Sequence, residues 1–247
     1  MLIKSFMLLY AAGAYITSTI SLVYIMGFLI NFGVPKGISD GSVSPLWESL
    51  LIDVGLVFLF GLHHSITARS SFKKWWTQII PPPIERATYL YMTSLMTFVL
   101  VYFWQPLPHT VWSFSSEVAV IAIYFVYLSI WAMMTAATFQ FGYLNFFGLM
   151  QVWKNFKNSP PKTPEMTAKY LYSLVRHPIS VGWMLAPLLT PTVTIGHLTF
   201  AVATFVYILV ATHFEEADLV KELGSSYIEY QNKVPAFLPF SKRKQSI

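Results

Sequence analysis

The side chains with the clearest chemical potential stand in two groups in the C-terminal third of the sequence. Arg176, His177 and Pro178 come directly before a long apolar stretch, and Glu215 and Glu216 come directly after it. A guanidinium, an imidazole and two carboxylates can bind a charged ligand or exchange protons with it. Pro178 suits the first turn of a helix, whose free amides favour anionic ligand groups. Together, these residues would form a small polar site.

The stretch between the two groups, residues 179–214, predicts a hairpin of two membrane helices. It contains no Lys, Arg, Asp or Glu, and a single span needs only about 20 residues. Thr190-Pro191-Thr192 lies near its middle, where proline ends a helix. A hairpin brings its two ends together, so we expect the basic and acidic groups to face each other. The alternative is an interfacial salt bridge, with Arg176 extended to lipid headgroups.

The remaining sequence predicts an all-α, polytopic transmembrane helix bundle. Hydrophobic residues make up 55% of the chain and charged residues 11%, with a mean hydropathy of +0.55. Soluble domains carry about 25% charged residues, so lipid must cover part of this surface. With the two arms of the hairpin, we expect about six spans in a single domain over residues 1–247. The other four apolar stretches are residues 6–32, 47–68, 87–105 and 117–139.

The basic residues predict how the bundle is oriented. With six spans, all of the 16 Lys and Arg residues except Lys36 fall on one side of the membrane. Cytoplasmic loops are enriched in Lys and Arg. We therefore expect both termini, and the site at the mouth of the hairpin, to be cytoplasmic.

Several classes of function are excluded or disfavoured. The chain has no cysteine, which removes disulfides, thiolate nucleophiles, Cys-ligated zinc and iron–sulfur clusters. No Gly-rich strand-to-helix motif predicts a Rossmann domain. The net charge of +5 is explained by basic residues at the inner membrane surface, so we expect lipid and no nucleic acid as a partner. No metal site is expected.

The C-terminal pattern resembles the isoprenylcysteine carboxyl methyltransferase superfamily. The pattern is Arg-His-Pro, a hairpin, then Glu-Glu-x-x-Leu219, Gly224, Tyr227, Tyr230 and a late proline, over about residues 165–240. Members are membrane methyltransferases that use S-adenosylmethionine. The segments 63–76, 85–89 and 147–153 resemble its bacterial methanethiol S-methyltransferase branch, which converts methanethiol to dimethyl sulfide. With them the resemblance covers nearly the whole chain.

This resemblance implies a cofactor site for S-adenosylmethionine within about residues 140–240. Glu215 matches the carboxylate that holds the amino end of the cofactor. Ser180 replaces a frequent tyrosine, and Ala211 replaces the arginine that faces the substrate in prenylcysteine enzymes. The substitution at 211 argues against a prenylcysteine carboxylate as the acceptor. The cofactor-binding candidates are Gln151, Tyr172, Arg176, His177, Pro178, Gly182, Glu215 and Glu216.

The implied acceptor is a small thiol, which must lose its proton before it attacks a methyl group. His63, His64 and Arg86 are the catalytic candidates, although adjacent histidines on a helix point about 100° apart, so that one of them is expected to pack between helices. Bulky residues near the site would limit the acceptor's size: Trp183, Phe147, Trp153 and Tyr143. Alternatives are another thiol, a prenylcysteine or a lipid amine as acceptor, or a non-enzymatic haem or solute-binding protein. Asp53, inside the second span, is expected to pair with a Thr or Tyr of a neighbouring helix.

Overall fold

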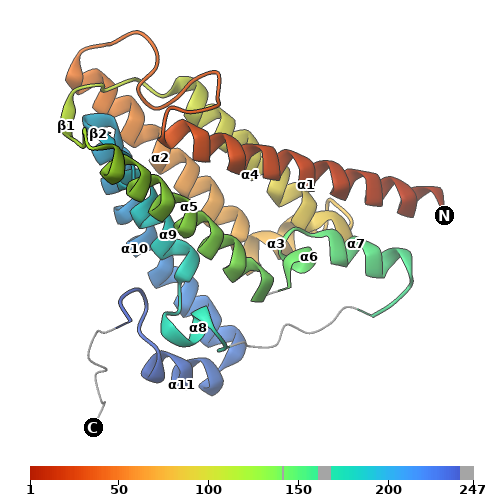
Figure 1. The fold of residues 1–247 in the computed structure, drawn as a ribbon. Coiled ribbons are helices and arrows are strands. Elements are labelled where there is room, and N and C mark those ends of the chain that lie inside the picture. The colour runs from red at the N-terminus through yellow and green to blue at the C-terminus, as the bar shows by residue number, and fades with distance from the viewer. Residues whose placement is uncertain (141, 161–167, 240–247) are drawn as a thin grey trace.

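A computed structural model of the chain describes residues 1–140, 142–160 and 168–239 (Figure 1). Its helices pack into a bundle, which confirms the all-α membrane class. Within these described ranges, four helices are long and apolar enough to cross a membrane. These are α1 (Leu2–Leu29), α2 (Leu46–Ala68), α5 (Glu117–Gln140) and α10 (Ile195–Leu223).

The two other predicted spans are shorter helices. The third span is α4 (Glu85–Phe103), with 19 residues. The first arm of the hairpin is α9 (Pro178–Leu185), which continues into the 3-10 turn η2 (Ala186–Leu188). Residues 189–194 complete this arm, because at 1.5 Å per residue its helical part alone is shorter than the roughly 30 Å hydrocarbon layer. Pro187 shortens the helical part, because proline cannot donate the backbone hydrogen bond that would continue the helix.

A two-stranded sheet was not predicted. Strand β1 (Thr110–Ser113) pairs antiparallel with β2 (Thr192–Thr194). It joins the loop after α4 to the turn of the hairpin, directly before α10. Figure 1 shows this sheet at one end of the bundle, with α8 (Leu171–Leu174) and α11 (Ser225–Lys233) at the other. We call these the sheet end and the α11 end.

Two of the three apolar clusters among the described residues hold the long helices together. The first surrounds Trp104 and Phe28, which are fully buried, and includes Tyr127. The second lies nearer the α11 end, where Tyr89 and Phe147 pack against alanines of α1. In both cores, α4 packs on α1, and it also contacts α2. The four remaining short helices are α3 (Ser70–Trp76), η1 (Pro82–Ile84), α6 (Tyr143–Phe146) and α7 (Leu149–Phe156).

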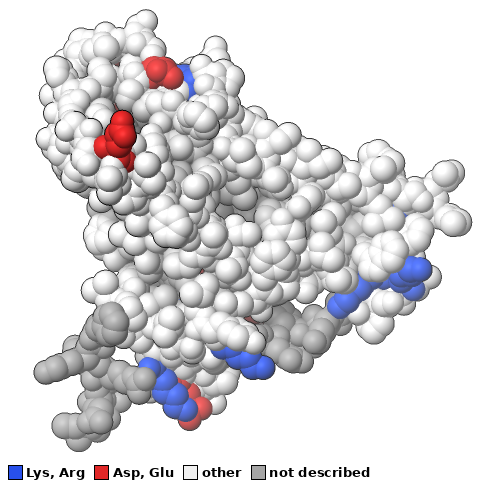
Figure 2. Space-filling model, in the orientation of Figure 1, with Lys and Arg blue, Asp and Glu red and all other residues white. Residues whose placement is uncertain are grey.

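Charged side chains are distributed unevenly over the surface. Figure 2 shows a broad uncharged middle, with most of the visible Lys and Arg toward the α11 end and the N-terminal region. An uncharged middle zone is what lipid contact requires. Among charged groups inside the bundle, Asp53 is fully buried, but the expected Thr or Tyr partner is wrong. Its Oδ1 accepts the backbone N–H of Gln105 at 2.8 Å, because the chain turns there as α4 ends.

Candidate active site

The mouth of the hairpin brings the basic and acidic groups into contact. The Arg176 Nε atom lies 2.7 Å from Glu216 Oε1, and His177 Nε2 lies 2.9 Å from the same oxygen. His177 is the residue before α9, and Pro178 is the first residue of that helix. Helix α10 continues past its apolar part and carries Glu216 to this position. The resulting ion pair is mostly shielded from solvent.

The C-terminal segment completes this cluster. The Arg176 Nη1 atom donates to the carbonyl oxygens of Gln231 at 3.2 Å and of Val234 at 2.5 Å. The backbone N–H of Arg176 also donates to the Pro235 carbonyl. Arg176 is therefore held by groups of the protein itself. The Gln231 side chain donates to Glu216 Oε2 at 3.0 Å, and no sequence pattern had indicated this residue.

Glu215 differs from Glu216 in its surroundings. Its side chain is 59% exposed, and its Oε2 lies 3.9 Å from His177 Nδ1. Within the described residues, it forms no closer ion pair. A carboxylate that is not paired inside the protein can accept a cationic ligand. The chemistry of this position therefore fits the ammonium group of an amino-acid-like cofactor.

Three tyrosines surround these carboxylates. Burial raises the pKa of Tyr172 and of Tyr227 well above the ordinary value, and nearby acidic groups act in the same direction. Burial likewise raises the pKa of Tyr230 to about 12. The Tyr230 hydroxyl donates to the Tyr172 carbonyl at 2.5 Å. All three therefore stay neutral, and Tyr227 and Tyr230 pack with Val234 in a small apolar cluster.

A second polar cluster joins α2 to α4. The Tyr89 hydroxyl lies 3.0 Å from the ring nitrogens of His64. The Arg86 guanidinium stands 4.7 Å from the centre of the Tyr89 ring, and its Nε donates to the Phe146 carbonyl at 2.8 Å. Gly148, with φ +75°, lets the chain between α6 and α7 pass close over Arg86. The catalytic candidates His64 and Arg86 are thus held around one tyrosine.

Helix α10 connects the two clusters. The hydroxyl of its Tyr207 lies 3.2 Å from that of Ser65 on α2, next to His64, and the same helix carries Glu215 and Glu216. His63 points elsewhere than His64, and its Nδ1 is buried without a hydrogen-bond partner among the described residues.

Helix α9 places two other predicted residues in packing contacts. An added Cβ at Gly182 would overlap the side chain of Met134, so this glycine lets α9 approach α5 closely. The Trp183 ring lies 5.3 Å from that of Trp131 and packs against the core around Trp104. Trp183, which is expected to limit the size of the acceptor, has its ring packed between α9 and α5.

The remaining candidates lie on α6, α7 and the turn between them. The Tyr143 hydroxyl bonds to that of Tyr15 at 2.9 Å, and Phe147 packs on the same tyrosine. Trp153 is about half exposed and stacks on Phe156. The Gln151 amide donates to the Asn145 carbonyl, whereas its own oxygen is buried without a partner among the described residues. Of this group, Gln151 alone has a free buried polar atom.

The fold and the site define an integral membrane protein with a polar site at one end of a helix bundle. Comparison with known proteins gives its family. The chain is 39% identical to the methanethiol S-methyltransferase of Crocosphaera subtropica, over 98% of this chain and 94% of the relative. It is 38% identical to methanethiol S-methyltransferase 2 of Bradyrhizobium diazoefficiens, over 96% and 92% of the two chains.

More distant similarity exists to nurim of Bos taurus, at 23% identity over 88% of this chain and 87% of that protein. No family model and no solved structure matches the chain. The similarity to these enzymes extends over almost the full length of this chain and of each relative. The chain therefore belongs to the methanethiol S-methyltransferase family, and it is a thiol S-methyltransferase.

Proposed function

We propose that this protein methylates methanethiol to dimethyl sulfide with S-adenosylmethionine as the methyl donor. The observation that carries the proposal is Glu215, a carboxylate beside His177 that is left free by the ion pair of its neighbour Glu216. The names of its relatives, which are methanethiol S-methyltransferases, support the same reaction. When bound, S-adenosylmethionine supplies an electrophilic methyl group on a sulfonium sulfur.

Glu215 and His177 would hold the amino end of the methyl donor. An ammonium group paired with a carboxylate gains a charge-assisted hydrogen bond. Tyr172 and Gln151 are the other proposed contacts, since Tyr172 adjoins Glu215 and Gln151 has an unpaired buried oxygen. In contrast, Arg176 and Glu216 would not contact the donor themselves. They would act on it by holding His177 in place.

His64 would take the proton of the thiol. A small thiol resembles cysteine, with a pKa of about 8.5, and it is mostly protonated at neutral pH. The thiolate formed on loss of this proton attacks the methyl carbon, and the bond from that carbon to the sulfonium sulfur breaks with its electron pair on that sulfur. Arg86 lies near His64 and Tyr89, where a positive charge favours the thiolate. The products are dimethyl sulfide, the demethylated donor and one proton.

The position in the membrane is part of the proposal. The relatives favour the cytoplasmic membrane of a bacterium, and the Lys and Arg distribution favours the termini and the site at the cytoplasmic face. Cytoplasmic S-adenosylmethionine would then reach the α11 end directly, and a small apolar thiol would enter through lipid. A reporter protein fused after Ile247 should be located on the cytoplasmic side of the membrane and show its activity there. Activity on the outer side would contradict this orientation.

The reaction is tested with purified protein in detergent. Protein, S-adenosylmethionine and methanethiol should produce dimethyl sulfide in the headspace and S-adenosylhomocysteine in equal amount. Farnesylcysteine and a lipid amine serve as competing acceptors. Methyl transfer to one of these, with none to methanethiol, would refute the acceptor while leaving the methyltransferase assignment intact.

A further inference from the structure

The Glu216 carboxylate is occupied on both of its oxygens. Oε1 accepts from Arg176 Nε at 2.7 Å and contacts His177 Nε2 at 2.9 Å. Oε2 accepts from the Gln231 amide at 3.0 Å. These partners come from the start of the hairpin and from α11, so Glu216 joins three separate segments.

This arrangement determines which nitrogen of His177 carries the proton. The ion pair with Arg176 keeps Glu216 in its carboxylate form, which can only accept hydrogen bonds. The contact at 2.9 Å therefore requires a proton on His177 Nε2. In the neutral ring the other nitrogen, Nδ1, is then an acceptor. Arg176 balances the charge of Glu216, and the Glu215 carboxylate beside Nδ1 leaves one negative charge, which a cationic ligand can neutralise in place of a protonated ring.

The free acceptor of His177 faces a second acceptor. Its Nδ1 lies 3.9 Å from Glu215 Oε2, and neither atom can donate to the other when the ring is neutral. Two acceptors at this separation can both bond to one donor group placed beside them. An alkylammonium group has three N–H donors and a positive charge, so it matches both the carboxylate and the imidazole nitrogen.

We propose that Glu216, held in place by Arg176 and Gln231, is a positioning residue that fixes His177 as the Nε2–H tautomer. His177 Nδ1 and the Glu215 carboxylate then form a paired acceptor for the ammonium group of an amino-acid ligand. This inference rests on the proposed function and adds two residues that act through His177. Helix α11 becomes part of the site, because Gln231 belongs to it.

The inference predicts that substitutions of Glu216 and Gln231 weaken the binding of the amino-acid end of the ligand and leave the binding of its nucleoside end unchanged. S-Adenosylhomocysteine carries the ammonium group, whereas 5′-methylthioadenosine has the same nucleoside and lacks the amino-acid part. In Glu216→Ala, Nδ1 is free to carry the proton and to donate to Glu215, which removes the imidazole acceptor and uses one acceptor position of the carboxylate. S-Adenosylhomocysteine should then bind about tenfold more weakly or worse, and 5′-methylthioadenosine should bind as before.

Gln231→Ala should give a smaller loss in the same direction, because Glu216 keeps its contact with Arg176. Asn232→Ala is the matched control, since this neighbour is exposed on the same helix, and it should change neither affinity. Dissociation constants are measured by equilibrium binding on purified protein. Equal weakening of both ligands, or no change in Glu216→Ala, would overturn the positioning role. Failure of the unmutated protein to bind S-adenosylhomocysteine would instead refute the proposed function.

The tautomer can be tested without a substitution at Glu216. In protein labelled with ¹⁵N-histidine, long-range ¹H–¹⁵N spectra separate the two neutral tautomers and the imidazolium. The chain has six histidines, and loss of one signal set in His177→Gln assigns the ring. We expect a protonated Nε2 and an unprotonated Nδ1 in the absence of ligand. An Nδ1–H tautomer or an imidazolium would contradict the inference, even if the Glu216 variant did not fold.

Discussion

The Tyr89 hydroxyl lies 3.0 Å from the ring nitrogens of His64, which joins α4 to α2 inside the bundle. The His64 ring also stacks on Phe60, with ring centres 5.6 Å apart. A base whose ring is held by a hydrogen bond and a stacking contact keeps its orientation while it accepts a proton. His63 has no such support, although it is the next residue of the chain.

The first prediction follows from this difference. His64→Gln should lower the rate of methyl transfer by about 10²–10⁴-fold, the usual contribution of a general base. The affinity for S-adenosylhomocysteine should stay unchanged, because the variant leaves Glu215 and His177 intact. His63→Gln is the matched control and should retain most of the activity. A large loss in His63→Gln with little change in His64→Gln would assign the base to the neighbouring ring.

The second prediction concerns the ammonium contact of Glu215. Glu215→Gln keeps the shape of the side chain and removes its charge, so the methyl donor should bind about tenfold more weakly or worse. The KM for methanethiol should change little. Glu229→Gln on α11 is the control, because this glutamate is exposed and its only ion pair among the described residues is with Lys233. Unchanged affinity for the donor in Glu215→Gln would remove this residue from the site.

The third prediction tests the packing role of Gly182. An added methyl group would overlap Met134, and overpacking of this kind costs about 1–3 kcal/mol. Gly182→Ala should therefore lower the unfolding temperature in detergent, and Met134→Ala in the same chain should restore part of it. If Gly182 only contacts the cofactor, the single variant would instead weaken donor binding without a change in stability.

The fourth prediction concerns the length of the acceptor. One added methylene changes discrimination by only about 1–3 kcal/mol in an apolar pocket, so a site for methanethiol must exclude longer thiols by its shape. Activity should fall steeply from methanethiol to butanethiol and be absent with farnesylcysteine. Relative kcat/KM values at fixed donor concentration measure this. A rate that increases with chain length would show that the acceptor site is open to lipid-like substrates.

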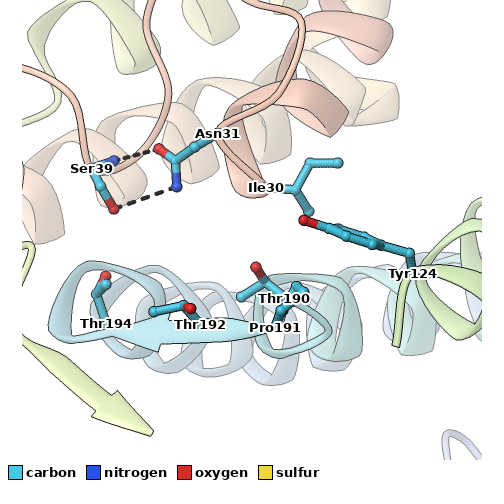
Figure 3. A pocket seen from close by; sticks show the side chains of 8 residues that line it. All are labelled: Ile30, Asn31, Ser39, Tyr124, Thr190, Pro191, Thr192 and Thr194. Atoms are coloured by element: carbon cyan, nitrogen blue, oxygen red, sulfur yellow. Dashed lines mark hydrogen bonds between the residues drawn. The ribbon is translucent and has the colours of Figure 1, made fainter. Parts of the chain in front are cut away.

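A polar pocket at the sheet end takes no part in these predictions. Figure 3 shows it at the sheet end, lined by hydroxyl groups such as those of Tyr124 and Thr190, with Asn31 hydrogen bonded to Ser39 beside it. Its volume is about 230 Å³. The pocket lies on the far side of the bundle from His177 and Glu215. Substitutions at Tyr124 can therefore serve as distant controls for activity.

The sequence by itself determined the class of the fold and the place of the polar site. A charge-free stretch of residues 179–214 with a central proline allows only a hairpin, and a hairpin brings Arg176 and Glu216 to the same place. Periodicity and composition depend on residues that are close together in the chain, so they can be recognised from the sequence alone. The four long membrane helices follow from the same property.

Only the tertiary structure determined which contacts the individual side chains make. The two glutamates are adjacent and of the same residue type, yet Glu216 pairs with Arg176 at 2.7 Å, whereas the ion pair of Glu215 among the described residues is a 3.9 Å contact with His177. Gln231 reaches Glu216 because the chain folds back through α11, and Trp183 packs on Trp131 because α9 lies against α5. Such contacts join residues far apart in the chain, and their geometry depends on the packing of whole helices. No pattern within one segment carries that information.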